Sequence, residues 1–167
     1  VFLHGDVRDV EVGRTFDAVI SMFAVMGYQA TEGDLAAAFA TARRHLEPGG
    51  LFLFDIWNGA AVTESPPEAN SREFPEDGGG KVIRSADPVL DEARQVVAVT
   101  IRVRHVSLQG EERESQELHS VRYLFPDEAE ALLRDAGFET VHICAFPDLD
   151  REANADDWNM SLVARAV

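Results

Sequence analysis

The sequence is poor in cysteine and has no long hydrophobic run, and each scarcity excludes a class of protein. Its one cysteine, Cys144, cannot form an internal disulfide, which fits a reducing compartment. The apolar runs are far shorter than the roughly 20 residues that span a bilayer. The charged start, VFLHGDVRDV, lacks the apolar stretch of a secretory signal. We therefore predict a cytoplasmic protein with no membrane segment.

Basic residues are scarce as well. The chain has 15 Lys and Arg against 30 Asp and Glu, a net charge of −15 at pH 7. Such a surface repels phosphate backbones, and the one tight basic cluster is ARRHL, so nucleic acid is not an expected partner. The length of 167 residues, 46% of them hydrophobic, suits a single globular domain. We assign no metal ligands.

The first part of the chain alternates strands with a helix. VFLHGD is typical of a strand tail followed by a turn, and FDAVIS of a second strand. EGDLAAAFATARRHLEPGG has apolar residues at helical spacing, acids near its start and bases near its end, which predicts a helix near 34–46. The Pro-Gly-Gly run stops it, and LFLFDIW follows as a strand suited to burial on both faces. This order predicts a βαβ unit.

The middle of the chain has a different pattern. Residues 60–80 are rich in Pro, Gly and acid, and predict a loop or lid. In QVVAVTIRVRHV every second residue is apolar, which predicts a strand with one dry and one polar face. KVIRSADP before it and ELHSVRYLF after it look like antiparallel partners. We therefore predict a small antiparallel sheet within 81–124.

The end of the chain returns to the α/β pattern. FPDEAEALLRDAGF predicts a helix near 126–136, with Pro126 in its first turn and Gly137 at its stop. ETVHICAF and DWNMSLVARAV predict two strands, and the acidic loop between them favours a hairpin. The predicted fold class is α/β.

Four segments in this order resemble the later part of class I S-adenosylmethionine-dependent methyltransferases: GDVRD, FDAVISMFAVMGY, LEPGGLFLFDIW and LLRDAGFETV. The stretch GDVRDVEVGRTFDAVISMFAVMGY is especially similar to the sugar N,N-dimethyltransferases that finish amino-deoxysugars such as desosamine. The resemblance implies a partial Rossmann-like core in 1–59 and 125–167, with 81–124 inserted on the acceptor side. It also implies S-adenosylmethionine as cofactor and a small polar acceptor, such as an amino-sugar nitrogen.

The resemblance implies a cofactor site as well. In that fold the acid after the third strand approaches the adenine amino group and the next backbone N–H reaches a ring nitrogen; Asp6 and Val7 hold those positions. Ligands of open α/β sheets bind outside the carboxyl ends of strands. Ser21, Met22 and Phe23 follow such a strand and are expected to form the pocket wall. Two plainer readings stay open: Asp6 is a turn residue, and the apolar residues only cap the core.

Methyl transfer needs an aligned lone pair, and a base only for the proton of the nucleophile. Tyr28 follows the pocket wall where related sugar enzymes can carry a His or Tyr, and His119 lies on a strand of the acceptor side. We predict both as catalytic. His105, Trp57 and Asn58 are predicted to contact the acceptor, although the tyrosine and the histidines could each have only a packing role. FDIWNG replaces the acidic-Pro-Trp-Trp stretch of the sugar enzymes, which puts the amino-sugar acceptor in doubt.

The family's glycine-rich loop, acid-x-Gly-x-Gly after the first strand, is absent from the sequence. The acid that holds the ribose at the end of the second strand is absent too. The glycines at 78–80 follow no strand and open no helix. We therefore expect a truncated methyltransferase, inactive by itself, whose sheet has a gap where the first two strands would lie. Exposed strand edges there favour pairing with another copy of the chain.

Two other functions stay open. Without the cofactor loop, the chain could be a non-catalytic binding or interaction domain derived from a methyltransferase. An NAD-linked oxidoreductase shares the doubly wound plan, but it needs the same glycine loop and explains GDVRD and LEPGG less well.

Overall fold

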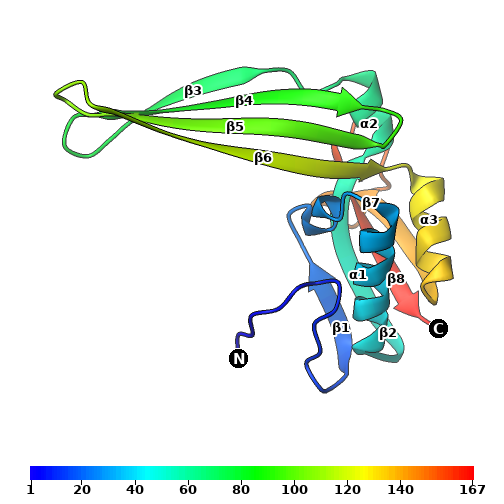
Figure 1. The fold of residues 1–167 in the computed structure, drawn as a ribbon. Coiled ribbons are helices and arrows are strands. Elements are labelled where there is room, and N and C mark those ends of the chain that lie inside the picture. The colour runs from blue at the N-terminus through cyan, green and yellow to red at the C-terminus, as the bar shows by residue number, and fades with distance from the viewer.

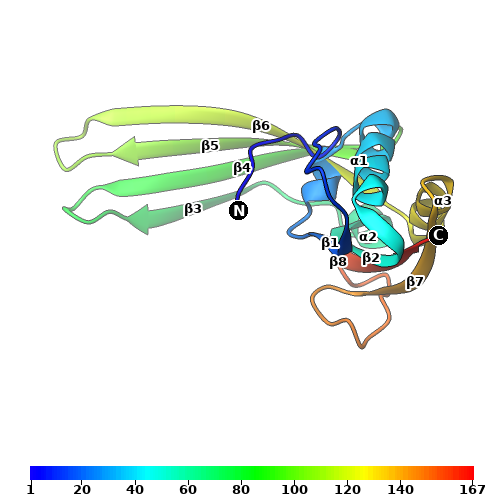
Figure 2. The same cartoon turned by 90° about the horizontal axis from the view of Figure 1, so that it is seen from below.

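The computed structural model describes residues 1–167 and has two parts, an α/β core and a long antiparallel sheet that projects from it (Figure 1). Seen from below, the projecting sheet extends well beyond the helices of the core (Figure 2). The core strands, in spatial order, are β1 (Phe16–Ser21), β2 (Leu46–Asn58), β8 (Asn159–Ala166) and β7 (Phe138–Ala145). The projecting strands are β3 (Asn70–Pro75), β4 (Lys81–Asp91), β5 (Val96–Val106) and β6 (Glu112–Leu124). The helices are the 3-10 helix η1 (Val25–Tyr28), α1 (Glu32–Arg44), α2 (Gly59–Glu64) and α3 (Pro126–Asp135).

The first unit of the core is the predicted βαβ arrangement. β1 pairs in parallel with β2, and α1 connects them. The side chain of Thr31 caps α1 by accepting a hydrogen bond from the backbone N–H of Asp34. The helix ends at Arg44, earlier than predicted, because Leu46 already pairs with Phe16 in the sheet. LEPGG therefore begins β2 instead of only ending the helix.

A cluster of phenylalanines fills the core between α1 and the sheet. Phe52 and Phe54 of β2 stack at 4.8 Å between ring centroids, and Phe39 of α1 lies 5.1 Å from Phe54. Phe138, at the start of β7, lies 5.5 Å from Phe52. All four side chains are buried, so the two phenylalanines of the run LFLF lie at the centre of the hydrophobic core.

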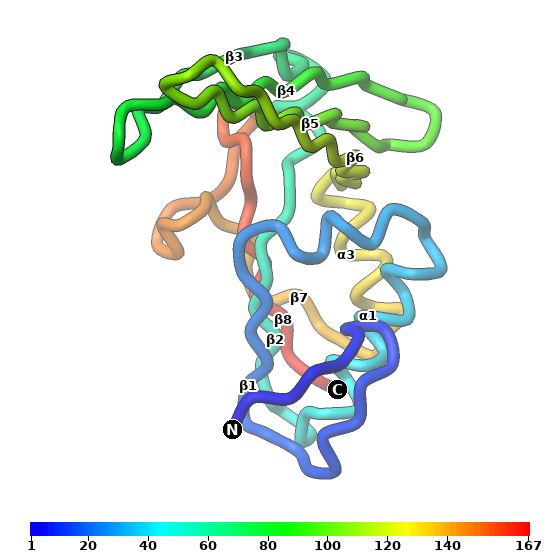
Figure 3. The backbone as a smooth tube through the Cα atoms, turned by 60° about the vertical axis from the view of Figure 1, so that its left-hand side comes forward, coloured from blue at the N-terminus to red at the C-terminus, as the bar shows by residue number.

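The strand predicted for VFLHGD does not form. Residues 1–15 contain no strand, and Figure 3 shows them running past β1 and α1. β1 pairs only with β2, so no strand within the chain covers its other edge, where Ile20 is 64% exposed. A strand needs a hydrogen-bonded neighbour, and residues 1–6 have none in this sheet.

The projecting sheet is antiparallel throughout, with unbroken register from β3 to β6. β6 then runs into the core, where Trp57 of β2 pairs in parallel with Tyr123. The prediction of a loop over 60–80 is wrong in two places, since α2 and β3 lie there. Asn58 caps α2, and β3 pairs with β4 along its whole length.

Mixed α/β architecture is thus the fold class of the chain. None of its helices combines the length and the apolarity that a membrane span requires.

The phenylalanine cluster gives a stability prediction. Phe54→Ala removes a fully buried ring and is expected to lower the free energy of unfolding by about 3–5 kcal/mol. Leu51→Ala, on the same strand but 39% exposed, is the matched control and should lose much less. Urea unfolding followed by circular dichroism measures both; equal losses would show that the core does not lie around Phe54.

Candidate functional site

The chain makes a sharp turn at the carboxyl end of β1, and a buried carboxyl group holds it. Phe23 and Ala24 have φ angles of 65° and 57°, in the left-handed region that such residues rarely adopt. The backbone N–H of Ala24 donates to Oδ2 of Asp55 at 2.9 Å, and Nδ2 of Asn159 donates to the same oxygen at 3.2 Å. Asp55 is completely buried on β2, so this contact fixes where η1 begins.

The turn brings Tyr28 to His119, the two residues predicted as catalytic. Tyr28 ends η1 and His119 lies on β6, 91 residues later, yet the tyrosine Oη and His119 Nδ1 are 3.0 Å apart. Gly27 permits this approach, since a Cβ there would lie 3.1 Å from the carbonyl oxygen of Arg122 and 3.0 Å from Val121 Cγ1. The glycine of VMGY is therefore a packing requirement.

Glu117 sets the direction of these hydrogen bonds. Its Oε2 lies 3.1 Å from His119 Nε2, and an ionised carboxylate can only accept, so Nε2 carries the hydrogen. In the neutral ring Nδ1 then accepts, and the Tyr28 hydroxyl donates to it. The lone pairs of the Tyr28 oxygen remain free for a donor from solvent or ligand, because the residue is 51% exposed.

Two tryptophans lie at the junction of core and projecting sheet. Trp57 on β2 and Trp158, just before β8, meet edge to face at 5.7 Å between ring centroids. Both pack against the small apolar cluster of Val62, Val97 and Tyr123. Val99, the cross-strand partner of His119, packs against the same cluster. Trp57, predicted on the acceptor side, thus lies where β2 pairs with β6, the strand that carries His119.

Asn58 and His105 do not join this group. Asn58 is buried, and its Nδ2 donates to the backbone carbonyls of Asn154 and Asp157 while its Oδ1 caps α2. Its polar atoms are already used, so the prediction that it contacts the acceptor is wrong. His105 hydrogen-bonds Glu76 at 3.0 Å. It lies six residues along β5 from Val99, roughly 20 Å at about 3.3 Å per residue, too far to share a small acceptor with His119.

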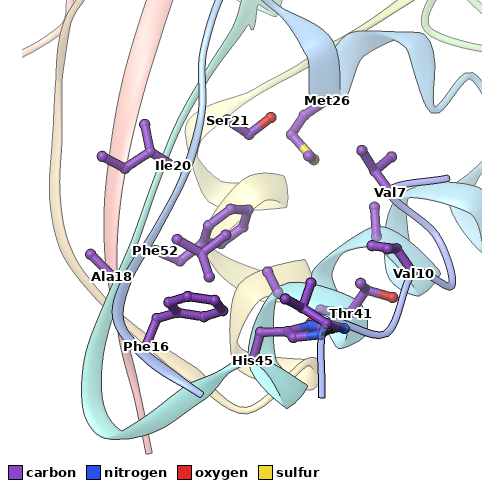
Figure 4. A pocket seen from close by; sticks show the side chains of 14 residues that line it. Val7, Val10, Phe16, Ala18, Ile20, Ser21, Met26, Thr41, His45 and Phe52 are labelled. Atoms are coloured by element: carbon purple, nitrogen blue, oxygen red, sulfur yellow. Dashed lines mark hydrogen bonds between the residues drawn. The ribbon is translucent and has the colours of Figure 1, made fainter. Parts of the chain in front are cut away.

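A cavity of about 310 Å³ lies between β1, α1 and residues 7–12 (Figure 4). Val7, Ser21 and Met26 surround one end, and Phe16 and His45 the other. Its wall is mostly apolar. Val7 and Ser21, both predicted to contact the cofactor, therefore share one cavity. Met22 and Phe23 do not line it; Phe23 is exposed and meets Phe146 edge to face at 6.2 Å.

Hydrogen bonds from α1 hold the segment that carries Asp6 and Val7. The hydroxyl of Thr41 donates to the carbonyl of Arg8 at 2.7 Å. His45, one turn later, accepts from the backbone N–H of Val12 at 2.9 Å through Nε2 and donates through Nδ1 to the carbonyl of Thr41. This histidine is neutral with its hydrogen on Nδ1, because Nε2 acts as an acceptor.

Asp6 itself is bound by Arg8. The guanidinium donates to Oδ1 at 2.9 Å and to Oδ2 at 2.7 Å, and the backbone N–H of Arg8 also donates to Oδ1. These hydrogen bonds lower the pKa of Asp6 from 3.8 to about 2. Arg8 also reaches Asp34 in the first turn of α1 at 2.8 Å, so it joins the two carboxylates.

Sequence reasoning missed Asp55, Glu117 and Trp158. Asp55 could have been found as the one charged residue in the apolar run LFLFDIW, because a carboxyl group buried in a strand needs hydrogen-bond partners. Glu117 stands two residues before His119 on a strand, and period two places both on one face. Trp158 carried no signal of its own, since its position depends on the β7–β8 loop.

The fold is similar to that of solved S-adenosylmethionine-dependent methyltransferases. With one from Clostridium acetobutylicum the TM-score is 0.80 at 16% identity, covering 97% of this chain and 63% of the other. With Streptomyces venezuelae DesVI it is 0.73 at 24% identity, covering 98% and 64%. No family model matches the sequence.

The sequence relatives are more specific. Over 53 residues, 32% of this chain, it is 49% identical to the dTDP-3-amino-3,4,6-trideoxy-alpha-D-glucopyranose N,N-dimethyltransferase of Streptomyces venezuelae, of which the match covers 22%. Over 93% of its length it is 26% identical to YqeM of Bacillus subtilis, of which the match covers 62%. Over about a third of its length the chain is therefore similar to amino-deoxysugar N,N-dimethyltransferases, as the sequence resemblance indicated. In each comparison it spans less than two thirds of the known protein.

The contact between Asp6 and Arg8 predicts a pH effect. Since the folded pKa of Asp6 is depressed, its contribution to stability is present above about pH 4 and is lost as the pH falls toward 2. Arg8→Gln should return the pKa of Asp6 to its ordinary range and flatten the acid limb of the stability profile. Carboxyl carbon NMR titration measures this, with Arg14→Gln as control because Arg14 lies over the Phe16 ring. An unchanged Asp6 titration in Arg8→Gln would contradict the assigned contact.

Proposed function

We propose that this chain carries the acceptor side and part of the cofactor side of an S-adenosylmethionine-dependent N-methyltransferase that acts on an amino-deoxysugar. The observation that carries the proposal is the hydrogen bond between Tyr28 and His119 at the carboxyl end of β1. The Streptomyces venezuelae relative named above supplies the reaction class, because its name describes N,N-dimethylation of an amino sugar.

The residues present fit part of the cofactor. The apolar cavity beside Val7 and Ser21 suits a flat, apolar-edged purine, and Asp6 lies next to Val7 in the chain. The Asp6 carboxylate would receive the adenine amino group only after giving up hydrogen bonds from Arg8. No acid-x-Gly-x-Gly loop is present for the methionine part. The chain thus supplies an apolar wall for the purine and lacks the loop that would hold the methionine part.

S-adenosylmethionine, when bound, supplies an electrophilic methyl group to the lone pair of the acceptor amine. The chain's own residues orient that amine. The Tyr28 oxygen accepts a hydrogen bond from an amine N–H, because its own hydrogen is given to His119. The proton released by the amine passes through Tyr28 and His119 to Glu117, whose side chain is 72% exposed to water. Trp57 and Trp158 provide an apolar wall for the sugar ring.

Removal of the tyrosine hydroxyl tests the catalytic pair. Tyr28→Phe should lower kcat by about 10²-fold, the smaller end of the range for a positioned acid or base. His119→Gln should give a similar loss. Transfer is measured by mass spectrometry with a dTDP-amino-deoxysugar, on the chain expressed with the coding sequence that precedes Val1 in frame. Tyr123→Phe and His142→Gln are the controls, since Tyr123 lies in the core and His142 on β7. Full activity in both Tyr28→Phe and His119→Gln would remove the pair from the mechanism.

Cofactor affinity of the 167-residue chain alone gives a second prediction. Each lost hydrogen bond to a charged group weakens binding by roughly 1.5–3 kcal/mol, and each 1.4 kcal/mol is tenfold. Loss of two or three such contacts should weaken a micromolar site by about two to six orders of magnitude. Isothermal titration with S-adenosylhomocysteine should therefore detect no tight binding. A micromolar or tighter dissociation constant would show that other residues replace the missing loop.

A further inference from the structure

Two phenylalanines meet at the carboxyl edge of the core sheet, outside the cavity described above. β1 is parallel to β2, and β7 runs in the same direction because β8 is antiparallel to both β2 and β7. Phe23 lies two residues after β1, and Phe146 directly follows β7. Their rings meet edge to face at 6.2 Å between centroids. Open α/β sheets bind their ligands at this edge.

Phe23 is exposed although its backbone is strained. Its side chain is 81% exposed, and its φ of 65° is an outlier for a bulky residue. The ring therefore contributes little through burial, while the backbone conformation costs stability. Strain of this kind is typical of binding sites.

One hydrogen-bond network positions both rings. Oδ2 of Asp55 accepts from the backbone N–H of Ala24, the residue after Phe23, and from Nδ2 of Asn159. The backbone N–H of Phe146 donates to the carbonyl of Asn159 at 3.2 Å. A single buried carboxyl group thus supports the two segments that carry the rings, which gives the pair the preorganised support that a binding site requires.

Asn159 also connects the phenylalanines to the acceptor side. It follows Trp158 in the chain and is the cross-strand partner of Trp57. Phe23 does not line the cavity assigned to the purine, and neither do Tyr28 and the two tryptophans. The phenylalanines therefore group with the acceptor residues and not with the cofactor cavity.

The surroundings of the pair favour a cation. Phe146 begins an acidic loop, in which Asp148 and Asp150 follow it within four residues. The one arginine of this loop, Arg151, forms its ion pair with Asp157 instead. An aromatic face attracts a cation through its quadrupole, and nearby carboxylates raise the local concentration of cations.

We propose that Phe23 and Phe146 bind the methylated ammonium group of the acceptor and so determine how many methyl groups it receives. This inference rests on the proposed function. Each methyl group replaces an N–H donor and weakens the hydration of the cation, so an aromatic face binds a methylated ammonium better than a primary one. The monomethylated product of a first transfer is therefore retained for a second.

The second transfer needs the same nitrogen at Tyr28. The retained ammonium gives up a proton, and its nitrogen lone pair forms the new N–C bond. The C–S bond of a second S-adenosylmethionine breaks at the same time, and its electron pair stays on sulfur. Phe23 and Tyr28 are five residues apart with a 3-10 turn between them, so their Cα atoms are separated by at most roughly 13 Å. One sugar-sized acceptor can reach both side chains.

The first test uses cations that carry no sugar, so it does not depend on methyl transfer. Methylammonium, trimethylammonium and tetramethylammonium chloride are titrated into the whole chain, and the methyl proton shifts of the probe are followed by NMR. Affinity should rise with the number of methyl groups, and an upfield ring-current shift should mark contact with a ring face. Phe23→Leu should weaken tetramethylammonium binding by about two- to thirtyfold. Phe23→Tyr, which keeps a ring, should bind like the wild type.

Leucine at position 23 keeps the Cβ and therefore the backbone strain, so this variant tests the ring alone. Phe74→Leu is the matched control, since Phe74 is 47% exposed but lies on β3 of the projecting sheet. Four outcomes would overturn the proposal: unchanged binding in Phe23→Leu, equal weakening in Phe74→Leu, affinity that does not depend on the number of methyl groups, or no ring-current shift.

A second test separates the ammonium of the acceptor from the sulfonium of the cofactor. The chain, expressed with the coding sequence that precedes Val1 in frame, is given an amino-deoxysugar, and mass spectrometry follows the mono- and dimethylated products. Phe23→Leu should raise the share of monomethylated product and leave KM for S-adenosylmethionine unchanged. An unchanged product ratio with a raised KM for S-adenosylmethionine would assign the ring to the sulfonium and overturn the proposal.

The proposed function fails separately from this inference. Binding of methylated cations without any methyl transfer would remove the enzyme assignment and keep the cation site. Methyl transfer without binding of these cations would keep the enzyme and remove the site.

Discussion

The position of the whole candidate site depends on one buried carboxyl group. Asp55 lies on β2, and its Oδ2 accepts hydrogen bonds from Ala24, after β1, and from Asn159 on β8. Three segments are therefore tied to one oxygen. Left-handed backbone at non-glycine residues costs on the order of 1–3 kcal/mol each and persists only where its surroundings impose it. Here Asp55 is part of what imposes it, and η1 carries Tyr28 to β6 as a result.

β6 connects this turn to the projecting sheet. Its last residues pair with β2 in the core, and its earlier residues pair with β5 outside it, so its register fixes both ends. Arg122 strengthens the junction, since it is buried and bonds Glu128 of α3 at 2.9 Å. His119 lies three residues before it. A shift of β6 by one residue would turn His119 to the opposite face, so the Tyr28 contact requires the same register that holds the sheet to the core.

The sequence predicted those elements whose side chains are buried on one side. Helical spacing marked α1, and alternation marked β5, because each presents one face to apolar neighbours. β3 has every residue exposed, so it carries no such pattern, and only the pairing with β4 makes it a strand. The opposite holds for VFLHGD: its apolar residues suit a sheet, but the predicted strand does not form because the chain offers it no neighbouring strand. Tyr28 and His119 were predicted separately, and their contact across 91 residues depended on Gly27 and on the Asp55 turn.

The segment that carries Asp6 is held in place without the strand predicted for it. α1 replaces the sheet as the support, through Thr41 and His45, and leaves Asp6 paired with Arg8. Asp6 already accepts hydrogen bonds from Arg8. It would bind a ligand poorly if losing these bonds left Arg8 without a partner. Arg8 has a second partner, Asp34, at 2.8 Å, so a ligand amine that takes Asp6 leaves the guanidinium still paired. Both carboxylates are partly exposed, and exposed ion pairs contribute little to stability. Exchange of Asp6 from Arg8 to the proposed purine ligand would therefore cost little in stability.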